Sequence, residues 1–147
     1  MAMIFTSCLH HKDAMFFKSR KSRNSDNSPL STGRFGEDLA LQYLKETGCV
    51  LVERNFRLRS GEIDIIVKDG DTLVFVEVKA RTNKRYGSPF DAIDHRKQRQ
   101  ISQTALAFIS KQRYEGWAVR FDVIAVYLDE QVPRVELLKN AFEYCGP

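Results

Sequence analysis

Four charged residues that could act together in chemistry lie in two closely spaced apolar segments: Glu62, Asp64, Glu77 and Lys79. The segments cover residues 61–67 and 73–79 and are rich in β-branched and aromatic side chains, which favours β-strands. The sequence Asp-Gly-Asp at residues 69–71 is a strong signal for a tight hairpin turn between them. A two-residue loop would place all four side chains on one face of the hairpin, because opposed residues share a face and side chains alternate along a strand.

Two registers of this hairpin are possible, and they differ in which acids face each other. A loop at residues 70–71 would pair Asp64 with Glu77, whereas a loop at residues 69–70 would pair Glu62 with Glu77. Apolar side chains fill the opposite face and also stand between the acids. A hairpin that is apolar on both faces is expected at the centre of a sheet covered on both sides. The acids are therefore predicted to lie in a largely buried surface.

Burying three carboxylates beside one lysine is electrostatically costly. Two carboxylates about 5 Å apart repel each other by roughly 3 kcal/mol at an effective dielectric constant of about 20. A divalent cation would supply the missing positive charge, and oxygen ligands with few His or Cys residues nearby favour magnesium or manganese over zinc. The hairpin leaves one alternative open, in which Glu77 and Lys79 form a structural ion pair while Glu62 and Asp64 lie at strand ends in water.

The composition predicts one domain, without a membrane span or a disulfide framework. The chain has 147 residues, of which 43% are hydrophobic, enough for a single core. Its net charge is +4, and residues 1–31 hold five basic and two acidic side chains, so a nucleic-acid partner must be bound by a local basic patch. Three cysteines without CxxC spacing favour a reducing, cytoplasmic location. No apolar segment is long enough to predict a membrane span.

The chain divides into a leader and one folded unit. Residues 1–32 are predicted to form a disordered basic leader, and residues 33–147 a single domain. The patterns predict an α/β fold in the order α-β-β-β-α-β, with a central mixed sheet flanked by helices. In addition to the hairpin, the helices are expected at residues 34–47 and 91–112, the strands at 50–56 and 119–128, and a short strand or helix at 133–142.

Two helical residues are expected to face the same core as the hairpin. Glu37 heads the apolar stripe of the first helix, although a glutamate there could simply stabilise the helix dipole. Lys97 lies on the apolar stripe of the second helix, which is an unusual place for a lysine. Either its stem packs while the ammonium group reaches water, or the ammonium group points at the acidic cluster.

Basic side chains near these segments predict a nucleic-acid surface. In the loop at residues 80–89 they are interleaved with Tyr86, an arrangement that suits a phosphate backbone with an unstacked base nearby. Solvated loop charge explains the same pattern equally well. The candidate residues are Arg57, Arg59, Arg81, Lys84, Arg85, Arg96 and Arg99.

Four sequence blocks, taken in order, resemble the bacterial YraN-like family. They are GRFGE at residues 33–37, RSGEID at 59–64, VFVEVKAR at 74–81 and RFDV at 120–123. That family is grouped with the restriction-endonuclease-like, PD-(D/E)xK nucleases and is similar to archaeal Holliday-junction resolvases. The resemblance covers about residues 33–143. It implies a restriction-endonuclease-like core and a nuclease of DNA repair or recombination, and resolvase-like relatives suggest a homodimer.

The resemblance also implies a role for each residue of the hairpin. Asp64 and Glu77 would bind Mg²⁺ or Mn²⁺ together with the main-chain carbonyl of Val78. Lys79 would position or deprotonate the attacking water and stabilise negative charge. The residues before Asp64 are Gly61 and Glu62, where the superfamily name would place a proline; this departure is normal for the family.

The remaining roles are accessory. Glu37 would act through water or a second metal ion, and Glu62 is another candidate for a second ion. Lys97 occupies a position at which related enzymes keep a Lys or Gln facing the site.

Three functions therefore remain open. The first is a metal-dependent endonuclease, a hydrolase that cleaves phosphodiester bonds in structured or branched nucleic acid, with DNA favoured. The second is a non-catalytic nucleic-acid-binding module on the same fold, and the third is a structural or adaptor protein whose acids form ion pairs. The chemistry of the residues and the resemblance favour the first.

Overall fold

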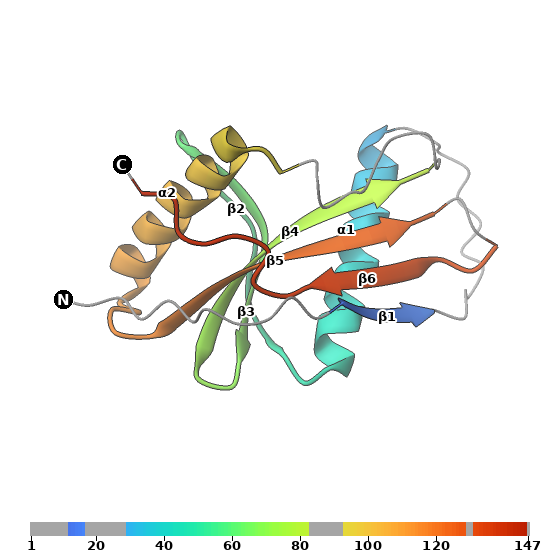
Figure 1. Ribbon diagram of the computed structural model, residues 1–147, viewed down its shortest axis with the longest axis horizontal. Coiled ribbons are helices and arrows are strands. Elements are labelled where there is room, and N and C mark those ends of the chain that lie inside the picture. Colours follow the sequence, from blue (N-terminus) through green and yellow to red (C-terminus); the bar gives the residue numbers. More distant parts are fainter. Residues whose placement is uncertain (1–11, 17–28, 83–92, 129–130, 147) are drawn as a thin grey trace.

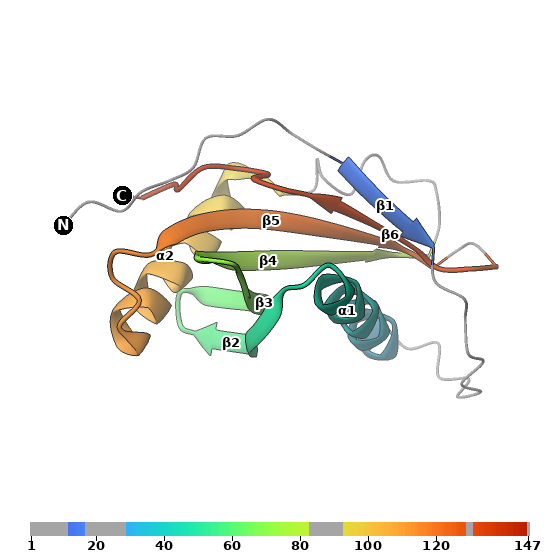
Figure 2. The same ribbon diagram turned by 90° about the horizontal axis from the view of Figure 1, so that it is seen from below.

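A six-stranded mixed sheet in the order β1-β6-β5-β4-β3-β2 forms the centre of the computed structural model, which describes residues 12–16, 29–82, 93–128 and 131–146 (Figure 1). The two helices of the described residues lie toward opposite ends of the long strands in both views (Figures 1 and 2). The elements in chain order are β1 Lys12–Phe16, α1 Pro29–Glu46, β2 Val50–Leu58, β3 Gly61–Asp69, β4 Thr72–Arg81, α2 His95–Gln112, β5 Ala118–Tyr127 and β6 Arg134–Leu138.

Each face of the sheet carries its own apolar core. On one side Ala40 and Leu44 of α1 pack against Ile65, Val74 and other branched residues of the central strands. On the other side Phe108 of α2 packs against Phe56 and Phe75 of the sheet, and Phe121 belongs to the same cluster. Burying one such side chain stabilises the fold by about 1.5–3 kcal/mol. The hairpin is therefore covered on both faces, as its sequence predicts.

The strands β3 and β4 form the predicted hairpin in the first of the two registers. Asp69 pairs with Thr72 and Ile65 pairs with Val76, so the loop consists of residues 70–71. Gly70 has a φ of 58°, a left-handed conformation that glycine adopts without steric cost. The backbone pairing between β3 and β4 ends at Ile65 and Val76. The next pair in this register would be Asp64 with Glu77.

The α-β-β-β-α-β order and the mixed sheet flanked by helices are confirmed, as is the restriction-endonuclease-like core that they form. β4 and β5 run parallel, with Glu77 beside Val123, and α2 connects them. The neighbouring pairs β3–β4 and β5–β6 are antiparallel. The segment at residues 133–142 contributes the strand β6 and not a helix, because its backbone continues the sheet beside β5.

The structure differs from the sequence prediction on the N-terminal side of the domain. The strand β1 lies within the predicted leader and pairs with β6, with Ala14 opposite Glu136; the open edge of β6 offers unpaired backbone groups that attract a further strand. The helix α1 begins at Pro29 and not at residue 34, and proline is well suited to a first helical position. Residues 1–11 and 17–28 lie outside the described part of the chain.

The second helix begins later than predicted, at His95 and not at residue 91. Asp94 has extended backbone angles, and its side chain accepts a hydrogen bond from the backbone N–H of Lys97 at 2.8 Å. This is an N-cap, which satisfies one of the free amides of the first turn. No helix in the described ranges combines the length and apolar character needed to cross a bilayer.

Candidate active site

Asp64 lies where the pairing between β3 and β4 stops. Its Oδ2 accepts a hydrogen bond from the backbone N–H of Val78 at 2.8 Å, so the side chain takes the place of a missing strand partner. Ile63 belongs to the apolar cluster under α2, while Ile65 belongs to the cluster under α1. A regular strand would place these two residues on the same face. The strand therefore changes its orientation at Asp64, which brings this carboxylate to the boundary between the two layers.

Glu77 is the most deeply buried acid of the site, with 4% of its side chain exposed. Its Oε1 lies 2.8 Å from Lys79 Nζ and 3.1 Å from Lys97 Nζ. Its Oε2 is buried and has no hydrogen-bond partner among the described residues. A buried polar atom without a partner costs about 1–3 kcal/mol, and more when the group is charged. Glu77 thus presents one oxygen that is removed from water and free to bind a cation.

The position of Lys97 decides between the two alternatives left open by the sequence. The ammonium group lies 3.1 Å from Oε1 of Glu77 and therefore points at the acidic cluster. The helix that carries it is fastened to the β2–β3 turn, because Ser60 Oγ and Thr104 Oγ1 lie 3.1 Å apart. A second lysine is thereby brought to the acids from the α2 side of the sheet.

The electrostatics of Asp64 mark it as an unusual carboxyl group. Burial and, second, the nearby charge of Glu77 raise its pKa from 3.8 to about 7. The charge of Glu37 raises this pKa further, while the Val78 N–H and the charge of Lys97 lower it. In the metal-free protein, Asp64 is therefore protonated below about pH 7 and ionised above it. Carboxyl groups whose pKa is shifted by burial and by a second acid occur preferentially at functional sites.

Glu37 approaches Asp64 from α1, which covers the face of the sheet opposite to α2. Its Oε2 accepts a hydrogen bond from Asn55 Nδ2 at 3.1 Å and lies 3.6 Å from Arg54 Nη2. Only 18% of its side chain is exposed. The structure thus brings Glu37, Asp64, Glu77, Lys79 and Lys97 together from two helices and two strands.

The region that contains these five residues is also the region recognised by comparison with known proteins. Residues 36–126 match "Uncharacterised protein family UPF0102". The chain belongs to this family. A UPF0102 protein of Syntrophus aciditrophicus is 48% identical over 114 residues, which cover 78% of this chain and 90% of that protein. A UPF0102 protein of Geobacter metallireducens is 50% identical over 113 residues, or 77% and 93% of the two chains.

A third relative is similar over a comparable share of its length. The UPF0102 protein of Clostridium botulinum is 47% identical over 114 residues, which cover 76% of this chain and 93% of that protein. The UPF0102 match begins at Gly36 and includes all five residues of the site. It ends within β5, so β6 lies beyond it.

Glu62 is not gathered into the site by the structure. Its Oε2 lies 3.1 Å from Arg57 Nε, and both side chains are well exposed, at 48% and 71%. An exposed ion pair of this kind contributes little to stability. Glu62 is not among the main groups that shift the pKa of Asp64, and a role for it in holding a second ion stays a prediction.

The basic residues predicted to bind nucleic acid differ in their exposure to solvent. Arg59, Arg96 and Arg99 are exposed, whereas Arg81 is half-buried. The Nε of Arg81 is buried without a hydrogen-bond partner in the described ranges. Lys84 and Arg85 lie outside the described residues.

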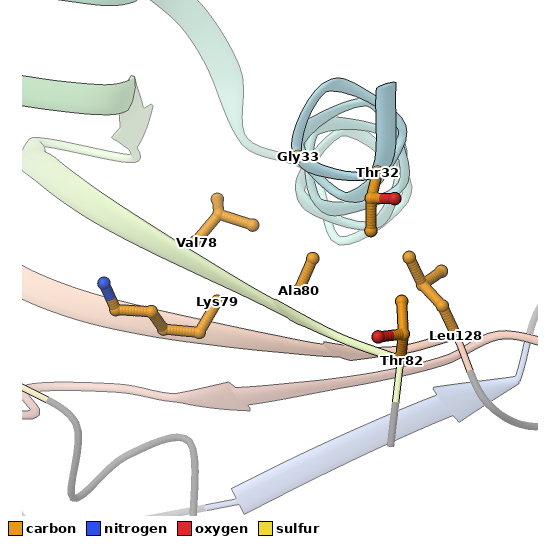
Figure 3. Close-up of a pocket in the computed structure, with 7 residues that line it drawn as sticks. All are labelled: Thr32, Gly33, Val78, Lys79, Ala80, Thr82 and Leu128. Atoms are coloured by element: carbon orange, nitrogen blue, oxygen red, sulfur yellow. The ribbon is translucent and has the colours of Figure 1, made fainter. Parts of the chain in front are cut away.

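A cleft of about 730 Å³ opens beside Lys79, between the start of α1 and the end of β4 (Figure 3). The helix comes very close to β4 there, since a Cβ added to Gly36 would lie 2.8 Å from the Cβ of Ala80. Figure 3 shows the Lys79 side chain extending away from the helix end. The cleft is lined by Thr32, Gly33, Val78, Lys79, Ala80, Thr82 and Leu128.

Proposed function

We propose that the protein is a metal-dependent endonuclease that hydrolyses phosphodiester bonds in structured or branched nucleic acid, with DNA as its substrate. The observation that carries the proposal is the buried, unpartnered Oε2 of Glu77 beside Asp64, whose pKa is raised to about 7. Two carboxyl groups that repel each other in a buried place are stabilised by a bound cation.

The donor set fits magnesium or manganese. Asp64, Glu77 and the main-chain carbonyl of Val78 would hold the ion. No cluster of three or more His, Cys, Asp or Glu side chains suited to a metal occurs in the described part of the chain. Magnesium does not need one, because it keeps several water ligands and binds through one or two carboxylates. When bound, the ion would polarise a phosphoryl oxygen and lower the pKa of a water molecule.

The two lysines supply positive charge to the same place. Lys79 is held by Glu77 Oε1 at 2.8 Å, which fixes the ammonium group at the edge of the cleft. In this position it can orient the attacking water and stabilise the negative charge that develops on the phosphate. Lys97 approaches Glu77 from α2 and would add a second fixed positive charge.

One observation favours a second function, a non-catalytic nucleic-acid-binding module or a structural protein. Glu77 contacts both Lys79 and Lys97, and Asp64 is neutral when it holds its proton. The negative charges of Glu37 and Glu77 then equal the positive charges of the two lysines, so the site is balanced without a metal ion. This alternative predicts salt-sensitive binding without metal-dependent cleavage.

The deciding experiment measures cleavage of flapped and four-way DNA junctions by purified protein with Mg²⁺ or Mn²⁺. We expect cleavage by the wild type and by Glu115→Ala, which changes an exposed acid beyond α2. Asp64→Ala and Glu77→Ala should be inactive while they remain folded by circular dichroism. Equal residual cleavage in the wild type and both site variants would indicate a contaminant and refute the proposal.

The cytoplasm is the location that we propose for the protein. Cys49 and Cys145 are free thiols, which suits the reducing cytoplasm where DNA is accessible. A homodimer stays a prediction, and sedimentation of the protein with and without DNA would test it.

A further inference from the structure

Asn55 has a backbone conformation that is unusual for its place in a strand. It lies inside β2 with a φ of 51°, in the left-handed region that residues other than glycine rarely adopt. Arg54 pairs with Ile65 and Phe56 pairs with Ile63, so Asn55 lies across from Asp64. Strained backbone persists only where the surrounding structure holds it, and it concentrates at functional sites.

In this conformation the Asn55 side chain contacts α1. Its Nδ2 donates a hydrogen bond to Glu37 Oε2 at 3.1 Å. The neighbouring Arg54 Nη2 lies 3.6 Å from the same oxygen and 2.8 Å from Asp38 Oδ1. The strand β2 therefore directs two donors at one oxygen of Glu37, and the second oxygen of that carboxylate is left to other partners.

We propose that Asn55 is a positioning residue that holds Glu37 at the site formed by Asp64 and Glu77. It fixes Oε2 of Glu37, so that Oε1 can accept a hydrogen bond from a water molecule bound at the site. An asparagine meets both requirements, because it tolerates the left-handed conformation and its amide donates to a carboxylate. Glycine would meet only the first requirement. This inference rests on the proposed function.

The chain contains a matched control for the backbone. Asn140 also has a φ of 51°, but it follows β6, where its backbone N–H donates to Asp122. Replacing either asparagine by glycine keeps the left-handed backbone and removes the amide group. The probe is the dissociation constant of Mn²⁺ measured by calorimetry, together with kcat and KM on a junction substrate. Circular dichroism checks that each variant is folded.

We expect Asn55→Gly to weaken Mn²⁺ binding about tenfold, the lower end of what is typical when a residue that orients a metal site is removed. We expect it also to lower kcat, with KM little changed, since in this proposal Asn55 acts through Glu37 and not on the substrate. Asn140→Gly should bind Mn²⁺ as the wild type does. Equal Mn²⁺ affinity of Asn55→Gly and the wild type would overturn the inference.

A double-mutant cycle shows whether Asn55 acts through Glu37. In a Glu37→Ala background, Asn55→Gly should change the Mn²⁺ affinity by less than about twofold, because the group that Asn55 holds is gone. Full additivity of the two substitutions would overturn the inference while leaving the proposed function intact. Failure of the proposed function looks different: the wild type itself would neither bind Mn²⁺ nor cleave, and the inference would fall with it.

Discussion

Lys97 Nζ lies 3.1 Å from Glu77 Oε1, and this contact joins α2 to the buried centre of β4. Lys79 Nζ contacts the same oxygen at 2.8 Å, so one buried carboxylate carries two ammonium groups. This arrangement is compatible with both functions considered for the site. In a nuclease the lysines would stabilise the charge on a reacting phosphate, and in a non-catalytic protein they would form a permanent ion-pair network with Glu77.

Replacing Lys97 by methionine should separate metal binding from stability. The stem of methionine fills a similar volume, but Glu77 loses one of its two partners, and we expect a loss of about 1–3 kcal/mol in the free energy of unfolding. Removing a positive charge beside the acids should also tighten Mn²⁺ binding, while cleavage slows if the charge assists the reaction. Lys111→Met, an exposed change in the last turn of the same helix, is the control. Weaker Mn²⁺ binding in Lys97→Met would contradict the assigned geometry.

The stability of the metal-free protein should fall as the pH rises through the window from about 4 to 7. The pKa of Asp64 is raised from its ordinary value of 3.8 to about 7 in the folded protein, so the folded state binds more protons than the unfolded state in this window. The free energy of unfolding then decreases with increasing pH. Asp64→Asn should remove this dependence and be more stable than the wild type at pH 8, by on the order of 2 kcal/mol.

Urea unfolding at a series of pH values, in the presence of a chelator, measures this effect. Asp71→Asn in the exposed hairpin turn serves as the control and should follow the wild type at every pH. Parallel pH profiles of the wild type and Asp64→Asn would show that Asp64 is not responsible.

Magnesium should raise the melting temperature of the protein, and by more at pH 8 than at pH 6. An ion that binds only the folded state stabilises it by mass action, and at lower pH it must displace the proton that Asp64 holds. Thermal unfolding at both pH values, with calcium and sodium salts at equal ionic strength as controls, measures the shift. A melting temperature that does not respond to magnesium at either pH would favour the ion-pair alternative.

The close contact between α1 and β4 should be intolerant of a larger residue at Gly36. An added Cβ would lie 2.8 Å from the Cβ of Ala80, so Gly36→Ala must push the helix away from the strand. We expect a loss of about 1–3 kcal/mol in the free energy of unfolding, together with weaker Mn²⁺ binding because Glu37 follows directly on the helix. Calorimetry and urea unfolding give the two values.

Gly33 provides the control for this substitution, because nothing lies within 4 Å of a Cβ added there. In the same helix, Gly33→Ala should stabilise the protein by about 0.5–1 kcal/mol, since alanine favours the helix more than glycine does. Equal effects of the two substitutions would show that the approach of α1 to β4 is not the cause.

The fold could be predicted from the sequence because its signals are local. The Asp-Gly-Asp turn and the apolar periodicity of the central strands follow from backbone and packing preferences of neighbouring residues. They predicted the hairpin, both long helices and the element order. The beginning of α1 was misplaced because Pro29 can start a helix as well as interrupt one. The strand β1 was missed because it depends on the distant edge of β6.

Asn55 shows what sequence reasoning could not find. It stands in a predicted strand with no feature that distinguishes it from a surface polar residue, and its contact with Glu37 joins residues 18 positions apart. A positive φ inside a strand cannot be read from a sequence, because it is imposed by the elements that pack around it.

The sequence by itself determined that Asp64, Glu77 and Lys79 belong to one hairpin, because the turn signal limits the register. Only the tertiary structure decided that Lys97 turns to Glu77, that Glu37 is held by Asn55, and that Glu62 stays outside with Arg57. These outcomes depend on how helices and strands distant in sequence approach each other, and burial then fixes which charged groups must find partners.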